Sequence, residues 1–159
     1  MKSLHLKSLS IAMGFLLLVA CQRHWGEFVS WKWSYSLEEL KNAPESLQVG
    51  NNWLVISGSV ARDAMPTIGE PDKPGKLFVS WEVAFQDPTQ VYDVELRPHY
   101  LWVMCGNRVF GTKITALVGN TTLKGICECN ESAQLVVEVS IGNKTALLKS
   151  SSLPVQCYY

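Results

Sequence analysis

The stretch Lys76–Phe85 (KLFVSWEVAF) decides the fold class of this 159-residue chain. Its apolar side chains recur at every second position and would share one face, namely Leu77, Val79, Trp81 and Val83. Successive side chains of a strand point to opposite faces, so this period of two is typical of a strand that buries one face. The pattern predicts a half-buried β-strand over 76–86.

Further short segments of strand character follow at a spacing of roughly ten residues and are separated by turn residues. They cover residues 53–61, 90–97, 99–105, 108–118, 122–129, 134–141 and 145–150. The dipeptide Gly142-Asn143 is the best candidate for a two-residue hairpin turn. Many short strands at even spacing indicate an all-β sandwich or barrel, and we expect an antiparallel β-sandwich.

A strand and one short helix are expected near the start of this domain. Residues 28–35 alternate like the stretch quoted above and predict another half-buried strand. The following Ser36-Leu37-Glu38-Glu39 matches a capping box, which opens a helix of one or two turns that Pro44 would end.

The alternation around Trp81 resembles the core-tryptophan strand of immunoglobulin-like and fibronectin-like sandwiches. The resemblance covers one strand, and no cysteine pair brackets Trp81 in the immunoglobulin manner. It implies a similar architecture without implying membership of the family.

The first 20 residues have the order of an export signal. Lys2 and Lys7 precede an apolar run over residues 9–20. The run has 12 residues, whereas a membrane-spanning helix needs about 20. We therefore expect residues 1–20 to be a signal peptide that is removed.

Leu18-Val19-Ala20-Cys21 resembles the lipobox of bacterial lipoproteins. The resemblance implies that Cys21 carries a diacylglycerol group, that residues 21–26 form a short tether and that residues 27–159 form a single β-sandwich domain. Gln22 follows the cysteine, which in the sorting pattern that this resembles implies anchoring in the outer membrane with the domain facing the periplasm.

An ordinary signal peptide followed by a chance cysteine is the alternative. Three glycosylation sequons, at Asn120, Asn130 and Asn143, support it, although turn sequences rich in asparagine also produce such triplets.

Composition narrows the classes of partner. Removal of residues 1–20 leaves 139 residues, the length of one domain, with 12 basic against 14 acidic side chains. The sequence has no run of basic residues, so it lacks the positive charge cluster that is typical of nucleic-acid binding.

The cysteine count fits an oxidising compartment. Once Cys21 is assigned to lipid, four cysteines remain, enough for two disulfides. Cys127 and Cys129 would lie two apart on one strand, where a direct bond is strained, so each should pair with Cys105 or Cys157. Which pairs with which stays open. A zinc site or a redox pair is the alternative use of these thiols.

Residues able to carry chemistry are few, and we expect neither an enzyme nor a cofactor. His99 is the one histidine remote from both the signal and the tether. Its position after Pro98 indicates a structural residue at a strand edge or bulge. Asp93 and Glu95, with Asp87 nearby, read as a solvent-facing row of a sheet and not as a metal site.

The expected function is a non-enzymatic interaction or structural module of the cell envelope, whose partners are the bilayer and an envelope protein that meets a sheet edge or loop. The alternative is a module that binds a small ligand or glycan through exposed aromatics and the Pro- and Gly-rich loop 62–75. Of the six tryptophans we expect Trp25 to be exposed, and Trp31, Trp33, Trp53, Trp81 and Trp102 to be core. The candidate binding surface on the loop comprises Arg62, Met65, Glu70, Asp72 and Lys73.

Overall fold

The predicted half-buried strand is β3 (Lys76–Phe85), which lies between β2 (Asn52–Asp63) and β6 (Val118–Lys124). Both neighbours pair with it in antiparallel register. In the computed structural model, which describes residues 35–65, 75–89 and 94–159, β3 buries the face that the alternation assigned to the core.

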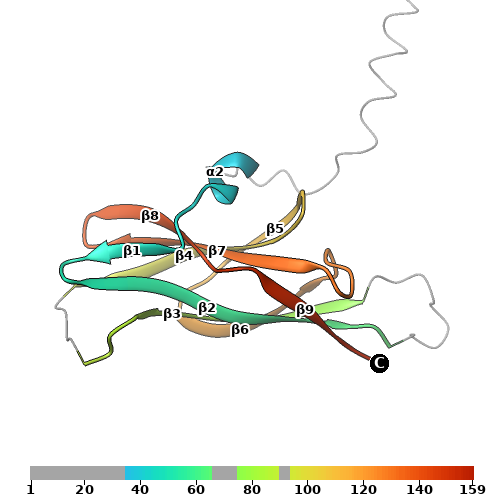
Figure 1. Cartoon of the computed structure of the whole chain (residues 1–159). Coiled ribbons are helices and arrows are strands. Elements are labelled where there is room, and N and C mark those ends of the chain that lie inside the picture. The colour runs from blue at the N-terminus through green and yellow to red at the C-terminus, as the bar shows by residue number, and fades with distance from the viewer. Residues whose placement is uncertain (1–34, 66–74, 90–93) are drawn as a thin grey trace, which may run out of the picture. The chain divides into compact units, whose positions relative to one another are not determined.

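Six more strands complete the sheet in the described residues. They are β1 (Ser46–Val49), β4 (Leu96–Cys105), β5 (Arg108–Lys113), β7 (Ser132–Ile141), β8 (Lys144–Lys149) and β9 (Leu153–Tyr158). The strand order is β5-β4-β7-β9-β2-β3-β6, with β1 on β2 and β8 on β7. In Figure 1 the half made of β2, β3 and β6 lies below the half made of β4, β5 and β7.

The all-β class is confirmed, but the finer expectation of an antiparallel sandwich is not supported, because one pair of strands is parallel. Strand β9 pairs in parallel with β2 and in antiparallel fashion with β7, so it joins the two halves into one mixed, nearly barrel-like sheet. The reason lies at Ser150, whose amide and hydroxyl bond to the backbone of Leu135. Strand β9 continues β8 along β7 in the same direction after the short link of residues 150–152, and it then turns to β2 and pairs with it in parallel.

Two predicted strand boundaries are also wrong. Residues 108–118 do not form one strand, because β5 ends at Lys113 and β6 begins only at Val118. The expected break at Pro98 is instead a bulge inside the continuous strand β4, and the register shifts between Pro98 and Tyr100. A proline cannot donate to the ladder, and the bulge accommodates it without ending the strand.

The prediction that Cys127 and Cys129 lie on a strand is wrong. Strand β6 ends at Lys124, and both cysteines belong to the irregular connection to β7. The sequence patterns also missed β1 and β9, whose short, partly polar segments show too little alternation to stand out.

The predicted two-residue turn at Gly142-Asn143 is confirmed by the pairing of Ile141 with Lys144. Gly142 has a φ of 58°, the left-handed conformation that this tight turn requires and that glycine adopts at little cost.

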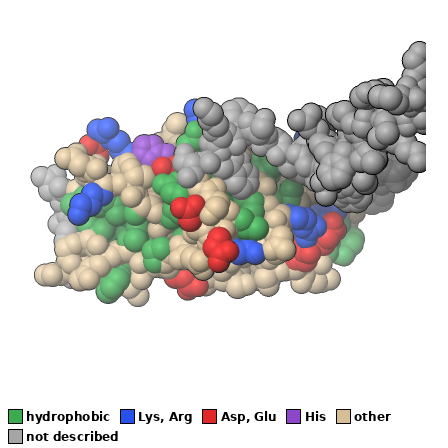
Figure 2. Space-filling model, turned by 90° about the horizontal axis from the view of Figure 1, so that it is seen from above, with side chains coloured by type: hydrophobic (Ala, Val, Ile, Leu, Met, Phe, Trp, Pro, Cys, Tyr) green, Lys and Arg blue, Asp and Glu red, His purple; other side chains and the backbone are tan. Residues whose placement is uncertain are grey.

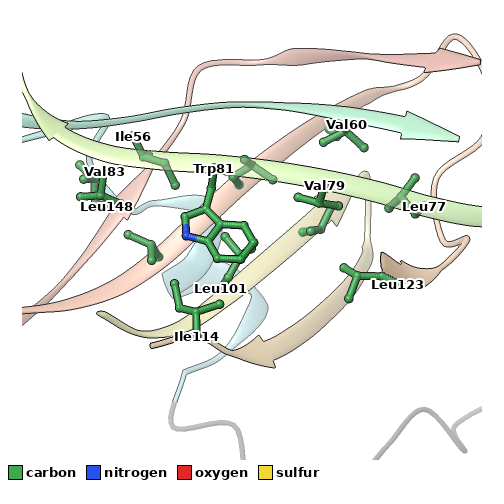
Figure 3. Close-up of a cluster of buried hydrophobic side chains, with 14 of the residues drawn as sticks. Ile56, Val60, Leu77, Val79, Trp81, Val83, Leu101, Ile114, Leu123 and Leu148 are labelled. Carbon is green, nitrogen blue, oxygen red and sulfur yellow. The ribbon is translucent and has the colours of Figure 1, made fainter. Parts of the chain in front are cut away.

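The core fills the space between the two halves of the sheet. Figure 3 shows the indole of Trp81 at the centre of this cluster. Around it lie aliphatic side chains from β2, β3, β4, β6, β8 and the β5–β6 connection, including Ile56, Val60, Leu77, Val79, Val83, Leu101, Ile114, Leu123 and Leu148. The Trp81 ring also covers Gly119, where an added Cβ would lie 2.6 Å from the ring.

The predicted helix is α2 (Leu37–Lys41), which begins at the expected capping box and ends before Pro44. The backbone amide and hydroxyl of Ser36 both donate to Glu39, and these bonds lower the pKa of that carboxyl group below its ordinary value. The helix lies over the half that contains β8 (Figure 1), where the amide of Lys149 donates to the carbonyl of Pro44 at 2.8 Å.

Candidate interaction surface

The outward face of β2, β3 and β6, here called the outer face, is the main candidate for contact with a partner. Its side chains form rows across the strands, because the register places Ser57 beside Glu82 and Val118, and Ser59 beside Ser80 and Asn120. A third row joins Ala61, Phe78 and Thr122. Most of these side chains are small and uncharged, and Phe78 is nevertheless 43% exposed.

Trp53 belongs to this outer face, so its assignment to the core is wrong. It is 43% exposed, whereas its neighbours Asn52 and Leu54 are buried. The alternation of β2 alone decides this, because Leu54 and Ile56 occupy the inward positions and Trp53 therefore points outward. Trp81 and Trp102 are buried, as expected, whereas Trp25, Trp31 and Trp33 lie outside the described residues.

Strand β6 forms one end of the sheet order and pairs only with β3 among the described strands. Natural proteins commonly protect such an edge with charges, proline or a covering element. In β6 the one charged residue is Lys124 at its end, and Val118 at its start is 61% exposed. The strand β5 at the opposite end of the order is flanked instead by Arg108 and Lys113.

The predicted binding loop is only partly within the described residues. Glu70, Asp72 and Lys73 lie outside them. Met65 is exposed, as a binding residue would be. The side chain of Arg62 is only 15% exposed, on strand β2, and its guanidinium pairs with the carboxylate of Glu128. Arg62 is therefore held by the fold.

The four cysteines expected to pair form two disulfides, Cys105–Cys127 and Cys129–Cys157. This selects one of the two pairings that the sequence left open, and the second bond ties β9 to the rest of the domain. All four sulfur atoms are thus occupied, which argues against their use in a zinc site or as free thiols. In addition, no group of three or more His, Cys, Asp or Glu side chains in the described parts of the chain is placed to hold a metal ion.

A small network of charges surrounds the two disulfides. Arg108 pairs with Glu131 and lies 3.9 Å from the carboxylate of Glu128, and Glu131 also accepts from the amide of Glu128 at 2.7 Å. The guanidinium of Arg62 donates to the carbonyl of Cys127 at 2.7 Å. This network fixes the shape of the connection between β6 and β7.

His99 lies at the β4 bulge, as expected, and its Nε2 is 2.7 Å from the hydroxyl of Ser140. Its carbonyl accepts from the amide of Ile114, so the backbone at the bulge is bonded as well.

The acidic row near β4 is described only in part, because Asp93 lies outside the described residues. Glu95 forms a two-bond pair with Arg97, which lowers the pKa of its carboxyl group. Asp87 accepts from the amide and hydroxyl of Thr89. The two carboxylates that are described thus have structural partners.

The surface carries both signs of charge. On the face shown in Figure 2, acidic and basic side chains lie interspersed, and hydrophobic side chains form several small patches. The three sequon residues Asn120, Asn130 and Asn143 are exposed.

Cys21 and the predicted signal lie outside the described residues. Where the chain is described, it contains no helix of the length and apolarity needed to cross a membrane.

No family model, curated protein or solved structure matches this chain.

Proposed function

We propose that this chain is a lipid-anchored protein of the bacterial cell envelope that acts as a non-enzymatic interaction module. The observation that carries the proposal is the exposure of Phe78 and Val118 on and beside β6, which pairs only with β3 among the described strands. Apolar side chains exposed next to a free edge offer a partner both backbone hydrogen bonds and apolar contact.

The chemistry of the described residues supports a binding role. His99, Glu95 and Arg62 each have structural partners, and the four cysteines are joined in disulfides. Disulfides are typical of exported proteins, which agrees with the export signal that we predict over residues 1–20.

The proposed site for the partner is β6 together with the adjoining outer face. An extended segment of an envelope protein would add a strand beside β6 and place alternate side chains over this face. Apart from Glu82, the three central rows of the outer face carry no charge. The contact would therefore depend on backbone pairing and apolar packing, with little contribution from charge.

We expect Val118→Lys to weaken capture of the partner from detergent-solubilised envelopes at least about tenfold, since about 1.4 kcal/mol of lost binding energy has that effect. A lysine here puts a charge beside the edge, which is how natural proteins block strand addition. The measurement is affinity capture followed by quantitative mass spectrometry. Tyr159→Lys, at another exposed position, is the matched control and should leave capture unchanged. Equal capture by wild type and Val118→Lys would contradict the proposed site.

A glycan is the second candidate ligand, and the exposure of Trp53 at one end of the outer face favours it. Aromatic rings flanked by uncharged polar side chains suit a neutral sugar chain. A tryptophan fluorescence change with neutral oligosaccharides that disappears in Trp53→Ala would support this candidate over an envelope protein.

The proposed anchor has a physical consequence for position. From Cys21 to Tyr35 there are 14 residue steps, which span at most about 50 Å when fully extended. The described domain would thus stay near the bilayer, and several acyl chains hold more firmly than one, at about 0.8 kcal/mol for each buried methylene.

We expect Cys21→Ser to yield an unlipidated precursor that no longer carries acyl chains. The measurement is intact mass of the protein from wild-type and variant cells, with membrane fractionation at high salt. Gln22→Ser, a neighbouring change that keeps the cysteine, is the control. If the Cys21→Ser protein carried the same added mass of acyl chains as the wild type and stayed in the membrane fraction, the proposed anchor would be disproved.

A further inference from the structure

The two disulfides lie in different surroundings, although they share the short segment Cys127-Glu128-Cys129. Cys105 and Cys127 are fully buried and belong to or adjoin the hydrophobic core. Cys129 and Cys157 are only partly buried. A thiolate must reach a sulfur atom to open a disulfide, so access alone favours attack on the second bond.

A basic residue, Arg62, is the backbone neighbour of one half of that second bond. Arg62 on β2 is the register partner of Cys157 on β9, so their Cα atoms are neighbours across two strands about 4.8 Å apart. Both side chains point to the inner side of this part of the sheet, as do their paired neighbours Val60 and Val155. A nearby guanidinium stabilises a cysteine thiolate and so makes that cysteine a better leaving group.

Other charged groups of the described residues lie near Arg62. The carboxylate of Glu128 pairs with Arg62 and offsets part of its positive charge, and Arg108 lies 3.9 Å from that same carboxylate. Two guanidinium groups therefore face one carboxylate on this side of the segment, with Glu131 bound to Arg108 beyond it. We expect the effect of Arg62 on Cys157 to be moderate for this reason.

We propose that Cys129–Cys157 is a site of reversible thiol–disulfide exchange with an external dithiol, while Cys105–Cys127 is a permanent structural bond. One thiolate of the dithiol attacks the sulfur of Cys129, a mixed disulfide forms, and Cys157 leaves as a thiolate beside Arg62. The second thiol of the reductant then attacks the mixed disulfide and releases Cys129. Two electrons and two protons pass to the protein, and the dithiol becomes a disulfide.

Exchange would loosen one end of β9. Beyond Val155 this strand is held to β2 by parallel pairing up to Asp63 and by the bond from the amide of Ala64 to the carbonyl of Tyr158 at 2.9 Å. The start of β9 has its own attachment, because the amide of Val155 donates to the carbonyl of Glu131. The opened bond thus removes one tie from residues 156–159, which keep their pairing with β2, and leaves the joint between the two halves of the sheet in place.

The test is native-state titration of the wild-type protein with dithiothreitol, followed by acid quenching, alkylation and peptide mapping of each cysteine. We expect Cys129 and Cys157 to become alkylated at a reductant concentration at least about tenfold below that which opens Cys105–Cys127. Hydrogen exchange at the amide of Ala64 should speed up at that first step, while core strands keep their protection. Simultaneous opening of both bonds, or opening of Cys105–Cys127 first, would overturn the proposal.

A variant pair tests the part assigned to Arg62. Arg62→Gln should slow opening of Cys129–Cys157 a few-fold, and Arg62→Lys should restore most of the rate because it keeps the charge. Arg108→Gln removes the other partner of Glu128 and controls for simple loosening of the segment. If the bond opens faster in Arg62→Gln than in Arg108→Gln, with circular dichroism unchanged in both, Arg62 holds the segment together and does not assist exchange.

Discussion

Trp81→Ala is expected to lower the free energy of unfolding by about 3–5 kcal/mol, the usual cost of removing a buried aromatic side chain from a core. The indole is 6% exposed and lies at the centre of the main cluster. It also donates from Nε1 to the carbonyl of Ala116 at 3.1 Å, so the variant leaves an acceptor unpaired as well as a cavity. Gly119 directly beneath the ring offers no side chain to fill that space.

The measurement is chemical denaturation of the mature domain, with its disulfides intact, followed by circular dichroism. Trp53→Ala is the matched control, because it removes the same side chain from a site that is 43% exposed, and we expect a loss of no more than about 1 kcal/mol. If the two variants lost equal stability, the placement of Trp81 at the centre of the core and of Trp53 on the outer face would be wrong.

Removal of the buried disulfide by the double change Cys105→Ala and Cys127→Ala is the second large effect, with an expected loss of about 3–5 kcal/mol. The bond spans 22 residues, and a loop of that length gives about 3.4 kcal/mol in the chain-entropy model. The sulfur atoms also belong to the core, so their loss adds a packing cost.

The second disulfide provides the control. Cys129–Cys157 spans 28 residues, for which the same model gives about 3.6 kcal/mol. Chain entropy alone therefore predicts nearly equal losses for the two bonds. We expect the Cys105–Cys127 variant to lose more, because only that bond lies in the core, and urea denaturation under identical conditions measures the difference. If the double change Cys129→Ala and Cys157→Ala lowered the free energy of unfolding more, the attachment of β9 would contribute more to stability than the packing of the buried disulfide.

Local patterns in the sequence determined the elements that depend on near neighbours. The alternation of 76–86 gave strand β3, the capping box at Ser36 gave the one described helix, and Gly142-Asn143 gave its hairpin. These features depend on side-chain direction, a local hydrogen bond and a backbone preference, and all three act within a few residues.

The candidate interaction surface could be predicted less well from local patterns in the sequence. Periodicity could show that Trp53 lies in a strand, but treating every tryptophan in a strand as core overlooked that its neighbours Leu54 and Ile56 occupy the inward positions. Loop composition singled out Arg62 as a binding residue, whereas a distant partner, Glu128, holds its side chain in the fold. The exposed edge of β6 had no local signal, because a strand becomes an edge only through the order in which all the strands pair.

By itself, then, the sequence determined an all-β domain with two disulfides to form and, as an expectation, a lipid anchor at Cys21. Only the tertiary structure decided that Cys105 pairs with Cys127, that β9 runs parallel to β2 and that Trp53, Phe78 and Val118 are exposed on one face of the sheet. The physical reason is the separation along the chain between the residues that interact. Side-chain alternation and turn preference are set within a few residues, whereas disulfide pairing, strand order and exposure depend on contacts between segments far apart in the chain, which no local pattern encodes.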